Sequence, residues 1–420
     1  FWFIGGWGGS VGVRACVRSP QAPKPSSPAT IVSAMPMRIA HVVAEYAGLA
    51  QTGGLADAVA ALTREMARQG HDVRIFLPRY ADLDATGLAL EPVERMDRCE
   101  TEFGKTEYRY SFMRSPVPDS KAALYLIDCP ALYGRPGIYT AETDEHRRFA
   151  LLARASLEGC QRLGWSPDVV HCHDWHAGLL PWYLRSPYAW DPLLKSAKSV
   201  LTVHNLAYQG VFGRETAAEL GDAQASLPLH PPAGEKRSVN FLATGLGWAD
   251  ACTTVIPTYA REFNTPERGM GSYGLLRERS EAPIGILNGV DYDRWDPRID
   301  PFIPERYTAE ALEGKSVCRR ELLAEHGLSP DPSGPVLGIV SRLAHQKGLE
   351  LVHAVLPEVL AAHDIRLVVL GTGEAQYERQ FEKLAEQFPR KVAFRCTFDL
   401  GLAHRIEAGS DIFLMPSRFE

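Results

Sequence analysis

An apolar run over residues 336–339 ends at the segment Val-Ser-Arg-Leu-Ala-His-Gln-Lys-Gly of residues 340–348, and helically spaced leucines and valines follow. This pattern predicts a buried parallel strand, a loop that carries Arg342 and Lys347, and a helix. Ligands of open α/β sheets bind at the carboxyl ends of the strands. Arginine grips phosphate oxygens with two donors, lysine adds a point charge, and a helix N-terminus favours anions. The loop therefore predicts a metal-free diphosphate site, although two solvated surface cations would explain an isolated Arg-x4-Lys spacing.

The same order of elements recurs at the start of the chain. Residues 37–43 predict a strand, residues 55–69 a helix, and residues 73–77 a second strand. Between the first strand and the helix lies Gln-Thr-Gly-Gly-Leu, in which Gly53 and Gly54 would let backbone N–H groups approach an anion closely. An ordinary tight turn is an equally good explanation of two adjacent glycines. The arrangement is typical of nucleotide-binding α/β domains.

Histidines and an aspartate lie at the predicted end of a further strand. Residues 167–176, Pro-Asp-Val-Val-His-Cys-His-Asp-Trp-His, predict a strand that runs into a helix start. His171 and His173 then share one face of the strand and Cys172 faces the other. We interpret His171 as structural, whereas Asp174 and His176 lie beyond the strand end, where ligands bind. We predict no metal site, because no companion Cys/His set occurs elsewhere in the sequence.

Composition limits the class of protein. The 420 residues include 45% apolar and 23% charged residues, with a net charge of −6. Basic tracts interleaved with aromatics are missing from the sequence, which argues against nucleic acid as a partner. The longest apolar runs fall short of the ~18 residues of a transmembrane helix, so we expect no membrane partner. Eight cysteines without framework spacing indicate a reducing compartment.

The pattern divides the chain into four parts. Residues 1–36 hold no Asp or Glu, and we interpret them as translated upstream sequence rather than a transit peptide. Residues 37–290 form a first Rossmann-like domain, residues 291–330 a linker with a helix, and residues 331–420 part of a second domain. Further strands are predicted at residues 122–127, 200–203, 251–255, 366–371, 392–397 and 411–416, and helices at residues 240–247 and 319–326. Residues 227–236 are proline-rich and predict a surface loop.

Seven motifs, in chain order, resemble those of bacterial glycogen synthases and plant starch synthases. They are Gln-Thr-Gly-Gly-Leu-Ala-Asp (51–57), His-Cys-His-Asp-Trp-His-Ala-Gly-Leu (171–179), Thr-Val-His-Asn-Leu-Ala-Tyr-Gln-Gly (202–210), Pro-Thr-Tyr-Ala-Arg-Glu (257–262), Gly-Ile-Leu-Asn-Gly-Val-Asp (285–291), Ser-Arg-Leu-Ala-His-Gln-Lys-Gly (341–348) and Pro-Ser-Arg-Phe-Glu (416–420). The resemblance covers residues 37–420.

The resemblance implies an α/β fold of the GT-B type, with two doubly wound Rossmann-like domains facing a cleft, the second of them incomplete here. It implies a hexosyltransferase that moves glucose from ADP-glucose to the non-reducing end of an α-1,4-glucan with retention, without a metal cofactor. Its partners are then the nucleotide sugar and the glucan. The implied location is the bacterial cytoplasm, or a plastid if residues 1–36 are a transit peptide.

The resemblance also assigns roles, residue by residue. The catalytic set is Asp174, His204, Arg342, Lys347 and Glu420. The donor-binding set is Gln51, Thr52, Gly53, Gly54 and Phe398, with Phe398 where relatives stack a tyrosine on the nucleobase. The acceptor-side set is Tyr139, His176 and Asn205.

Two departures from the family pattern leave alternatives open. The first motif carries Gln51 where the family has lysine, which opens the choice between ADP- and UDP-glucose and a second GT-B activity with UDP-glucose. The chain ends at Glu420, whereas the family continues with further strands and a helix. A non-catalytic glucan-binding fragment is the second alternative, and we expect the 420-residue chain by itself not to turn over.

Overall fold

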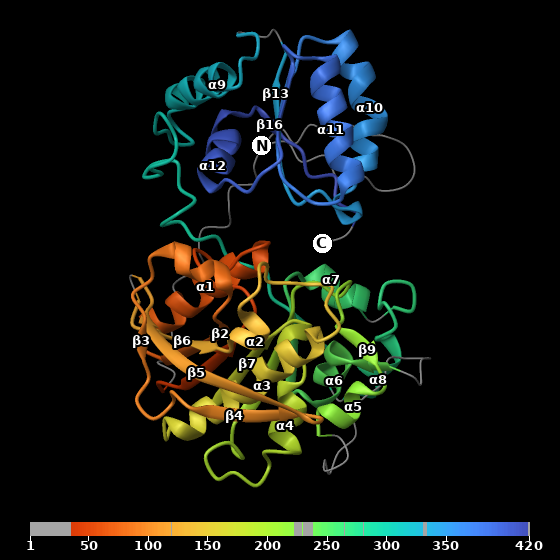
Figure 1. Cartoon of the computed structure of the whole chain (residues 1–420). Helices are drawn as coiled ribbons and strands as arrows, with labels where there is room; N and C mark the ends of the chain where they lie inside the picture. The colour runs from red at the N-terminus through yellow and green to blue at the C-terminus, as the bar shows by residue number, and fades with distance from the viewer. Residues whose placement is uncertain are drawn as a thin grey trace. The chain divides into compact units, whose positions relative to one another are not determined.

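The computed structural model describes residues 35–118, 120–221, 229, 238–263, 265–279, 281–330 and 334–418. These residues fall into two compact units, one up to Gly289 and one from Val290 onward, and each unit is described by itself. Figure 1 colours the first unit from red to green and the second from green to blue. No helix among the described residues is both long and apolar enough to cross a membrane.

The first unit is built on a ten-stranded sheet in the order β12-β11-β8-β7-β1-β2-β6-β5-β3, with β4 paired to β5. Its strands are β1 (Arg38–Val42), β2 (Asp72–Pro78), β3 (Glu91–Pro92), β4 (Cys99–Phe103), β5 (Thr106–Pro116), β6 (Ala123–Asp128), β7 (Val169–His173), β8 (Lys198–Val203), β11 (Ala251–Thr254) and β12 (Ile284–Gly285). The seven strands from β12 to β6 are parallel, and β5 runs antiparallel to β6.

Helices cover both faces of this sheet because successive strand residues point to opposite sides. In β2, Ile75 and Leu77 pack with α1 (Gly54–Arg68), whereas Phe76 packs with α3 (Glu145–Arg162). The other elements in the described part of the unit are α2 (Pro130–Tyr133), α4 (Leu180–Arg185), α5 (Thr216–Glu219), α6 (Phe241–Trp248), α7 (Pro257–Phe263), α8 (Tyr273–Glu278), the 3-10 turns η1 (Ala81–Thr86) and η2 (Trp175–Ala177), and a two-stranded antiparallel sheet of β9 (Val211–Gly213) and β10 (Ser238–Asn240). The unit is thus a doubly wound α/β domain.

The strand order reverses at β1. From β1 the chain proceeds through β2 and β6 to one side, and it then returns to β7, β8, β11 and β12 on the other side. Loops that leave the carboxyl ends of two strands at such a switch point diverge and open a crevice between them, which is the usual ligand site of open α/β sheets. The loops after β1 and β7 are therefore the places to look for function.

The second unit holds a four-stranded parallel sheet in the order β15-β14-β13-β16. Its strands are β13 (Val336–Val340), β14 (Arg366–Leu370), β15 (Val392–Arg395) and β16 (Ile412–Phe413), and its helices are α9 (Glu313–Glu325), α10 (Leu349–Ala362), α11 (Ala375–Gln387) and α12 (Leu400–Gly409). Helices α10 and α11 pack on one face and α9 and α12 on the other, around two separate apolar clusters (Figure 1). The short turn η4 (His345–Lys347) precedes α10.

Most predicted elements are confirmed to within a few residues, including the helix that Asn240 caps by accepting the Ala243 N–H. The antiparallel strands β3 to β5 and the two-stranded sheet of β9 and β10 were not predicted. The last predicted strand, residues 411–416, is shorter than expected, since β16 covers only Ile412–Phe413. Of the proline-rich stretch at residues 227–236, all but Leu229 lies outside the described residues.

Candidate active site

Asp174 begins the loop after β7, at the switch point of the first sheet. Its backbone has a φ of +55°, which is rare for a residue with a side chain and is found where surrounding structure enforces it. Its Oδ1 accepts the backbone N–H groups of His204, at 2.7 Å, and Asn205, at 3.3 Å. The structure therefore brings together three of the predicted residues, Asp174, His204 and Asn205, from the ends of β7 and β8.

The Asp174 carboxyl is buried, with 6% of the residue exposed. Burial raises its pKa to about 7, the two backbone N–H donors oppose that rise, and the charge of Glu45 adds to it. A buried carboxyl group with a pKa near neutrality is a common mark of a functional site. Among the described residues of this unit, Asp174 is therefore our first candidate for a catalytic residue.

His204 lies at the end of a row of hydrogen-bonded imidazoles. Its Nε2 is 3.1 Å from Nδ1 of His173, and Nε2 of His173 is 3.1 Å from Nδ1 of His41 in β1. Burial lowers the pKa of His204 to about 3 and lowers that of His173 and His41 well below the ordinary value. These rings are therefore neutral at physiological pH, and His204 can act as a hydrogen-bonding group but not as a fixed cation.

The histidines of β7 lie on one face, as predicted, and stack with ring centroids 4.3 Å apart. Nε2 of His171 is 2.6 Å from the Thr202 hydroxyl, which agrees with a structural role for His171. His41, His171 and His173 offer nitrogens within 4.8 Å of one another, a grouping that the sequence analysis missed because His41 is 130 residues away. Both nitrogens of His173 already face other imidazoles, so a metal ion there would have to displace a hydrogen bond.

Tyr139 and His176 form a stacked pair on the α3 side of the switch point. Their ring centroids are 4.8 Å apart at an interplanar angle of 20°. Nδ1 of His176 is buried and has no hydrogen-bond partner among the described residues. The Tyr139 hydroxyl donates to Oε1 of Glu45. Two of the three residues predicted for the acceptor side, Tyr139 and His176, are therefore neighbours, and Tyr139 contacts the loop after β1.

Glu45, three residues after β1, is the functional candidate that the sequence analysis overlooked. Its carboxylate accepts the backbone N–H groups of Thr52, at 2.6 Å, and Gly53, at 3.2 Å, and the Thr52 hydroxyl at 2.8 Å. The N–H groups of Thr52 and Gly53 thus bind the carboxylate of Glu45 in this structure. The available signal was an acidic residue just beyond the carboxyl end of the first strand.

The local backbone conformation does not require glycine at residue 53 or at residue 54. Both lack a positive φ, and a Cβ added at either would meet no atom of the described structure within 4 Å. An ordinary tight turn that depends on glycine is therefore not the explanation, and the open space beside both residues suits the approach of a ligand. Gln51, the departure from the family motif, donates its side-chain N–H to Asp57 at 2.6 Å.

In the second unit, Arg342 and Lys347 lie where the sequence predicted them, between β13 and α10. Lys347 ends the turn η4, and Gly348, with a φ of +65°, caps α10. A Cβ on Gly348 would lie 2.1 Å from the Pro416 carbonyl oxygen, so this glycine is needed for the close approach of two loops. Arg342 donates to the Gln346 side chain at 3.4 Å, and the Arg418 N–H donates to the Gln346 carbonyl at 2.9 Å.

The other predicted residues of the second unit are placed only in part. Phe398 precedes Asp399, the N-cap of α12, and 66% of its surface is exposed, which leaves its ring accessible for stacking. Glu420 lies outside the described residues. The loops after β13 and β16 meet where Pro416 contacts Gly348 and Arg418 contacts Gln346, beside the loop of Arg342 and Lys347.

Comparisons with known proteins agree with this picture. Residues 38–278 match the starch synthase catalytic domain family, and residues 334–420 match the family of group 1 glycosyl transferases. A glycogen synthase of Myxococcus xanthus is 43% identical over 388 residues, covering 91% of this chain and 80% of the relative. A glycogen synthase of Aeromonas hydrophila is 39% identical over 392 residues, covering 92% and 78%.

Solved structures show the same relationship. The catalytic domain of starch synthase IV from Arabidopsis thaliana, bound to ADP and acarbose, has a TM-score of 0.83 and 32% identity, and the match covers 92% of this chain and 79% of that one. The trehalose-6-phosphate synthase OtsA has a TM-score of 0.51 at 13% identity over 90% and 78% of the two chains, which shows the shared GT-B fold alone. The chain therefore belongs to the glycogen and starch synthase family of glycosyltransferases.

Proposed function

We propose that this glycosyltransferase transfers glucose from ADP-glucose to the 4-hydroxyl at the non-reducing end of an α-1,4-glucan, with retention at the anomeric carbon. The observation that carries the proposal is the convergence of Asp174, His204 and Asn205 at the switch point of a chain 32% identical to an ADP-bound starch synthase. The bond from glucose C1 to the diphosphate breaks with its electrons on ADP. The glucan oxygen bonds to C1, and its proton passes to a phosphate oxygen of the departing ADP.

We assign the residues to three roles: stabilising the departing diphosphate, binding the donor and binding the acceptor. Arg342 and Lys347 supply the positive charge that stabilises the departing diphosphate, with Glu420 in the same catalytic set. Preorganised donors of this kind stabilise a transition state by about 2.7–4 kcal/mol each. Gln51, Thr52, Gly53, Gly54 and Phe398 bind the donor, and Tyr139, His176 and Asn205 bind the acceptor. Because side chains provide the cations, the reaction needs no metal ion.

The direct test is incorporation of labelled glucose into glycogen by the complete protein, with ADP-glucose and UDP-glucose in parallel and with EDTA present or absent. We expect incorporation from ADP-glucose that EDTA does not change. Preferred use of UDP-glucose would overturn the donor assignment. Activity that disappears in EDTA and returns with Mg²⁺ or Mn²⁺ would overturn the proposal of a metal-free site.

Gln51 gives a second test of the donor site. A hydrogen bond to a charged group contributes about 1.5–3 kcal/mol and a neutral one about 0.5–1.5 kcal/mol, a difference of roughly 1 kcal/mol or about fivefold in affinity. We therefore expect Gln51→Lys to lower the KM for ADP-glucose by up to about fivefold. The ammonium group would also face Asp57, the present partner of Gln51, which keeps it beside the glycine loop. Steady-state kinetics with both donors would measure the change, and a higher KM for ADP-glucose would contradict it.

A further inference from the structure

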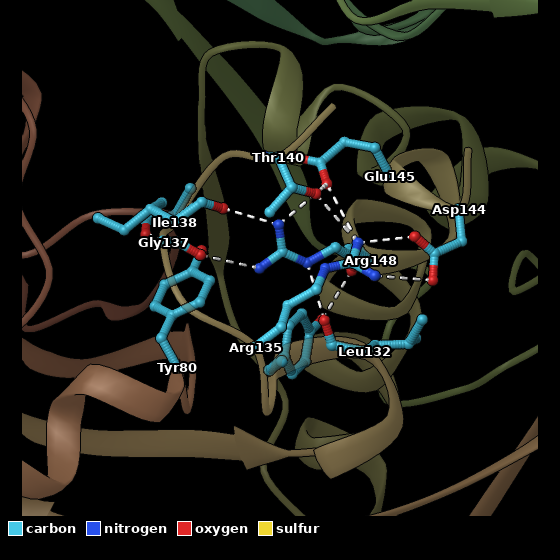
Figure 2. Close-up of polar contacts among 11 residues, drawn as sticks. Tyr80, Leu132, Arg135, Gly137, Ile138, Thr140, Asp144, Glu145 and Arg148 are labelled. Carbon is cyan, nitrogen blue, oxygen red and sulfur yellow. Dashed lines mark hydrogen bonds and ion pairs between the residues drawn. The ribbon is translucent and has the colours of Figure 1, made fainter. Parts of the chain in front are cut away.

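A buried ion pair on α3 lies beneath the loop that carries Tyr139. Arg148 is fully buried, and its Nη1 is 2.9 Å from Oε2 of Glu145, one helical turn away. Its Nε donates to the Leu132 carbonyl at 2.9 Å, and its guanidinium lies 5.6 Å from the centre of the Tyr80 ring. Figure 2 shows these groups converging on the guanidinium. A charge this deep is costly unless it is well paired, so its contacts are informative.

The ion pair holds the backbone on both sides of Tyr139. Arg148 donates to the carbonyls of Ile138, at 2.8 Å, and Gly137, at 3.4 Å. Glu145 accepts the Thr140 N–H at 3.1 Å and the Thr140 hydroxyl at 2.6 Å. The residues before and after Tyr139 are thus fixed by opposite members of one pair (Figure 2). The direction of the Tyr139 side chain follows from this arrangement.

A second pair closes the same loop at its other end. Arg135 donates to both carboxylate oxygens of Asp144, at 3.0 and 2.6 Å, and to the Thr140 hydroxyl at 3.1 Å. Bidentate pairs of this kind fix geometry as well as adding energy. The loop from Arg135 to Thr140 is therefore tied to the start of α3 at both ends.

Tyr139 links the loop at residues 135–140 to the glycine loop at residues 51–54 through Glu45. Its hydroxyl donates to Glu45, whose carboxylate in turn accepts the N–H groups of Thr52 and Gly53. Tyr80 provides a parallel connection, because its hydroxyl donates to the carbonyl of Ala44, the residue before Glu45. The contacts run without interruption from Arg148 to the loop at residues 51–54.

We propose that Arg148 and Glu145 are positioning residues for this reaction: they set Tyr139 and, through Glu45, the donor-side loop at residues 51–54. The inference deepens the proposed function and rests on it. Both residues are buried, so we assign them no contact with the substrate. A pair that only stabilises the fold would lower the melting temperature and leave the geometry of the glycine loop unchanged.

The test uses two variants, one at Arg148 and one at Thr140, which donates to Glu145, and one matched control in the complete protein. Thr140→Val removes the hydroxyl that donates to Glu145 and keeps the shape of the side chain, and Arg148→Lys keeps the charge but loses the multiple donors. Arg147→Met is the control, because Arg147 is the next residue of α3 and is also paired, but to Glu219 and Tyr108. Thr140→Val keeps the test informative if Arg148→Lys fails to fold.

We expect Thr140→Val and Arg148→Lys to lower kcat/KM for ADP-glucose by about tenfold, within the range of coupling between contacting residues. Combining Thr140→Val with Tyr139→Phe should give little further loss, since Thr140 acts on the glycine loop through the Tyr139 hydroxyl. Arg147→Met should leave kcat/KM within about twofold. Additive losses with Tyr139→Phe, or equal losses in the control, would overturn the inference.

Amide hydrogen exchange separates this inference from the proposed function, because it needs no turnover. Exchange at Thr52 and Gly53 should rise in Thr140→Val and Arg148→Lys and stay unchanged in Arg147→Met. Absence of glucose transfer by the unsubstituted protein would refute the function alone. Unchanged exchange at both residues in Thr140→Val and Arg148→Lys would refute the positioning role alone.

Discussion

Replacing Arg342 or Lys347 by alanine is expected to lower kcat by about 10²- to 10³-fold, the usual cost of removing one preorganised donor from a developing negative charge. Both side chains lie on the loop between β13 and α10, and that loop is fixed by the approach of Gly348 to Pro416. Neither belongs to the apolar clusters of the second unit, so the fold should survive the substitutions. The loss should appear in kcat because the charge develops as the bond to the diphosphate breaks.

Glucose incorporation and thermal melts measured on the same preparations would check this expectation. Lys383→Ala is a suitable control, because it removes one positive charge from the exposed face of α11, about two turns into that helix. A general effect of net charge would appear in the control as well. Near-normal turnover of either loop variant would refute the diphosphate site.

Much of this fold could be predicted because its strands are buried on both faces and its helices are amphipathic. The apolar runs of β1, β13 and β14 and the helical spacing after Gly54 and Gly348 are local signals, and they placed these elements within a few residues. Strands β3 to β5 are partly exposed and pair antiparallel at the edge of the sheet, so their pattern is weaker. Strand order, which creates the switch point at β1, depends on long-range pairing that no local pattern encodes.

Residues of the candidate site could be placed from the sequence where they stand at strand ends, and not where they meet only through the pairing of distant strands. Asp174, His204 and Asn205 stand directly at strand ends, whereas His41 joins His173 only through the pairing of β1 with β7. Arg147 and Arg148 look alike in the sequence, yet only Arg148 is fully buried. Arg148 lies three and four residues before the buried Leu151 and Leu152, on the same face of the helix. This spacing could have identified Arg148 as buried.

Asp174→Asn is expected to stabilise the first unit at neutral and alkaline pH while lowering turnover. The pKa of Asp174 is about 7 in the folded protein and about 3.8 in a model compound. Because the folded pKa is the higher one, the folded state binds the proton more tightly, and stability falls as pH rises from about 4 to about 7. An amide carries no charge, and its oxygen can still accept the N–H groups of His204 and Asn205. The penalty should therefore disappear in the variant.

The magnitude follows from the size of the shift. Three pKa units correspond to roughly 4 kcal/mol, and a domain of 150–250 residues gains about 2–4 °C in Tm per kcal/mol. Thermal melts should then show a Tm gain for Asp174→Asn on the order of 10 °C at pH 8 and a smaller gain at pH 5, where less of the penalty is present. An equal gain at both pH values, or a loss at pH 8, would contradict the raised pKa.

Turnover gives the complementary measurement. We expect the ionised Asp174 carboxylate to stabilise the positive charge that develops on the glucose ring as the bond from C1 to the diphosphate breaks, and an amide dipole to do so far less. The kcat of Asp174→Asn should fall by about 100-fold, of the order seen when a preorganised electrostatic group is removed. In the unsubstituted protein, kcat should rise with pH through an apparent pKa near 7 as Asp174 ionises, and this rise should be missing in the variant. A pH profile that keeps the same inflection in Asp174→Asn would assign the titration to another group and remove Asp174 from the catalytic set.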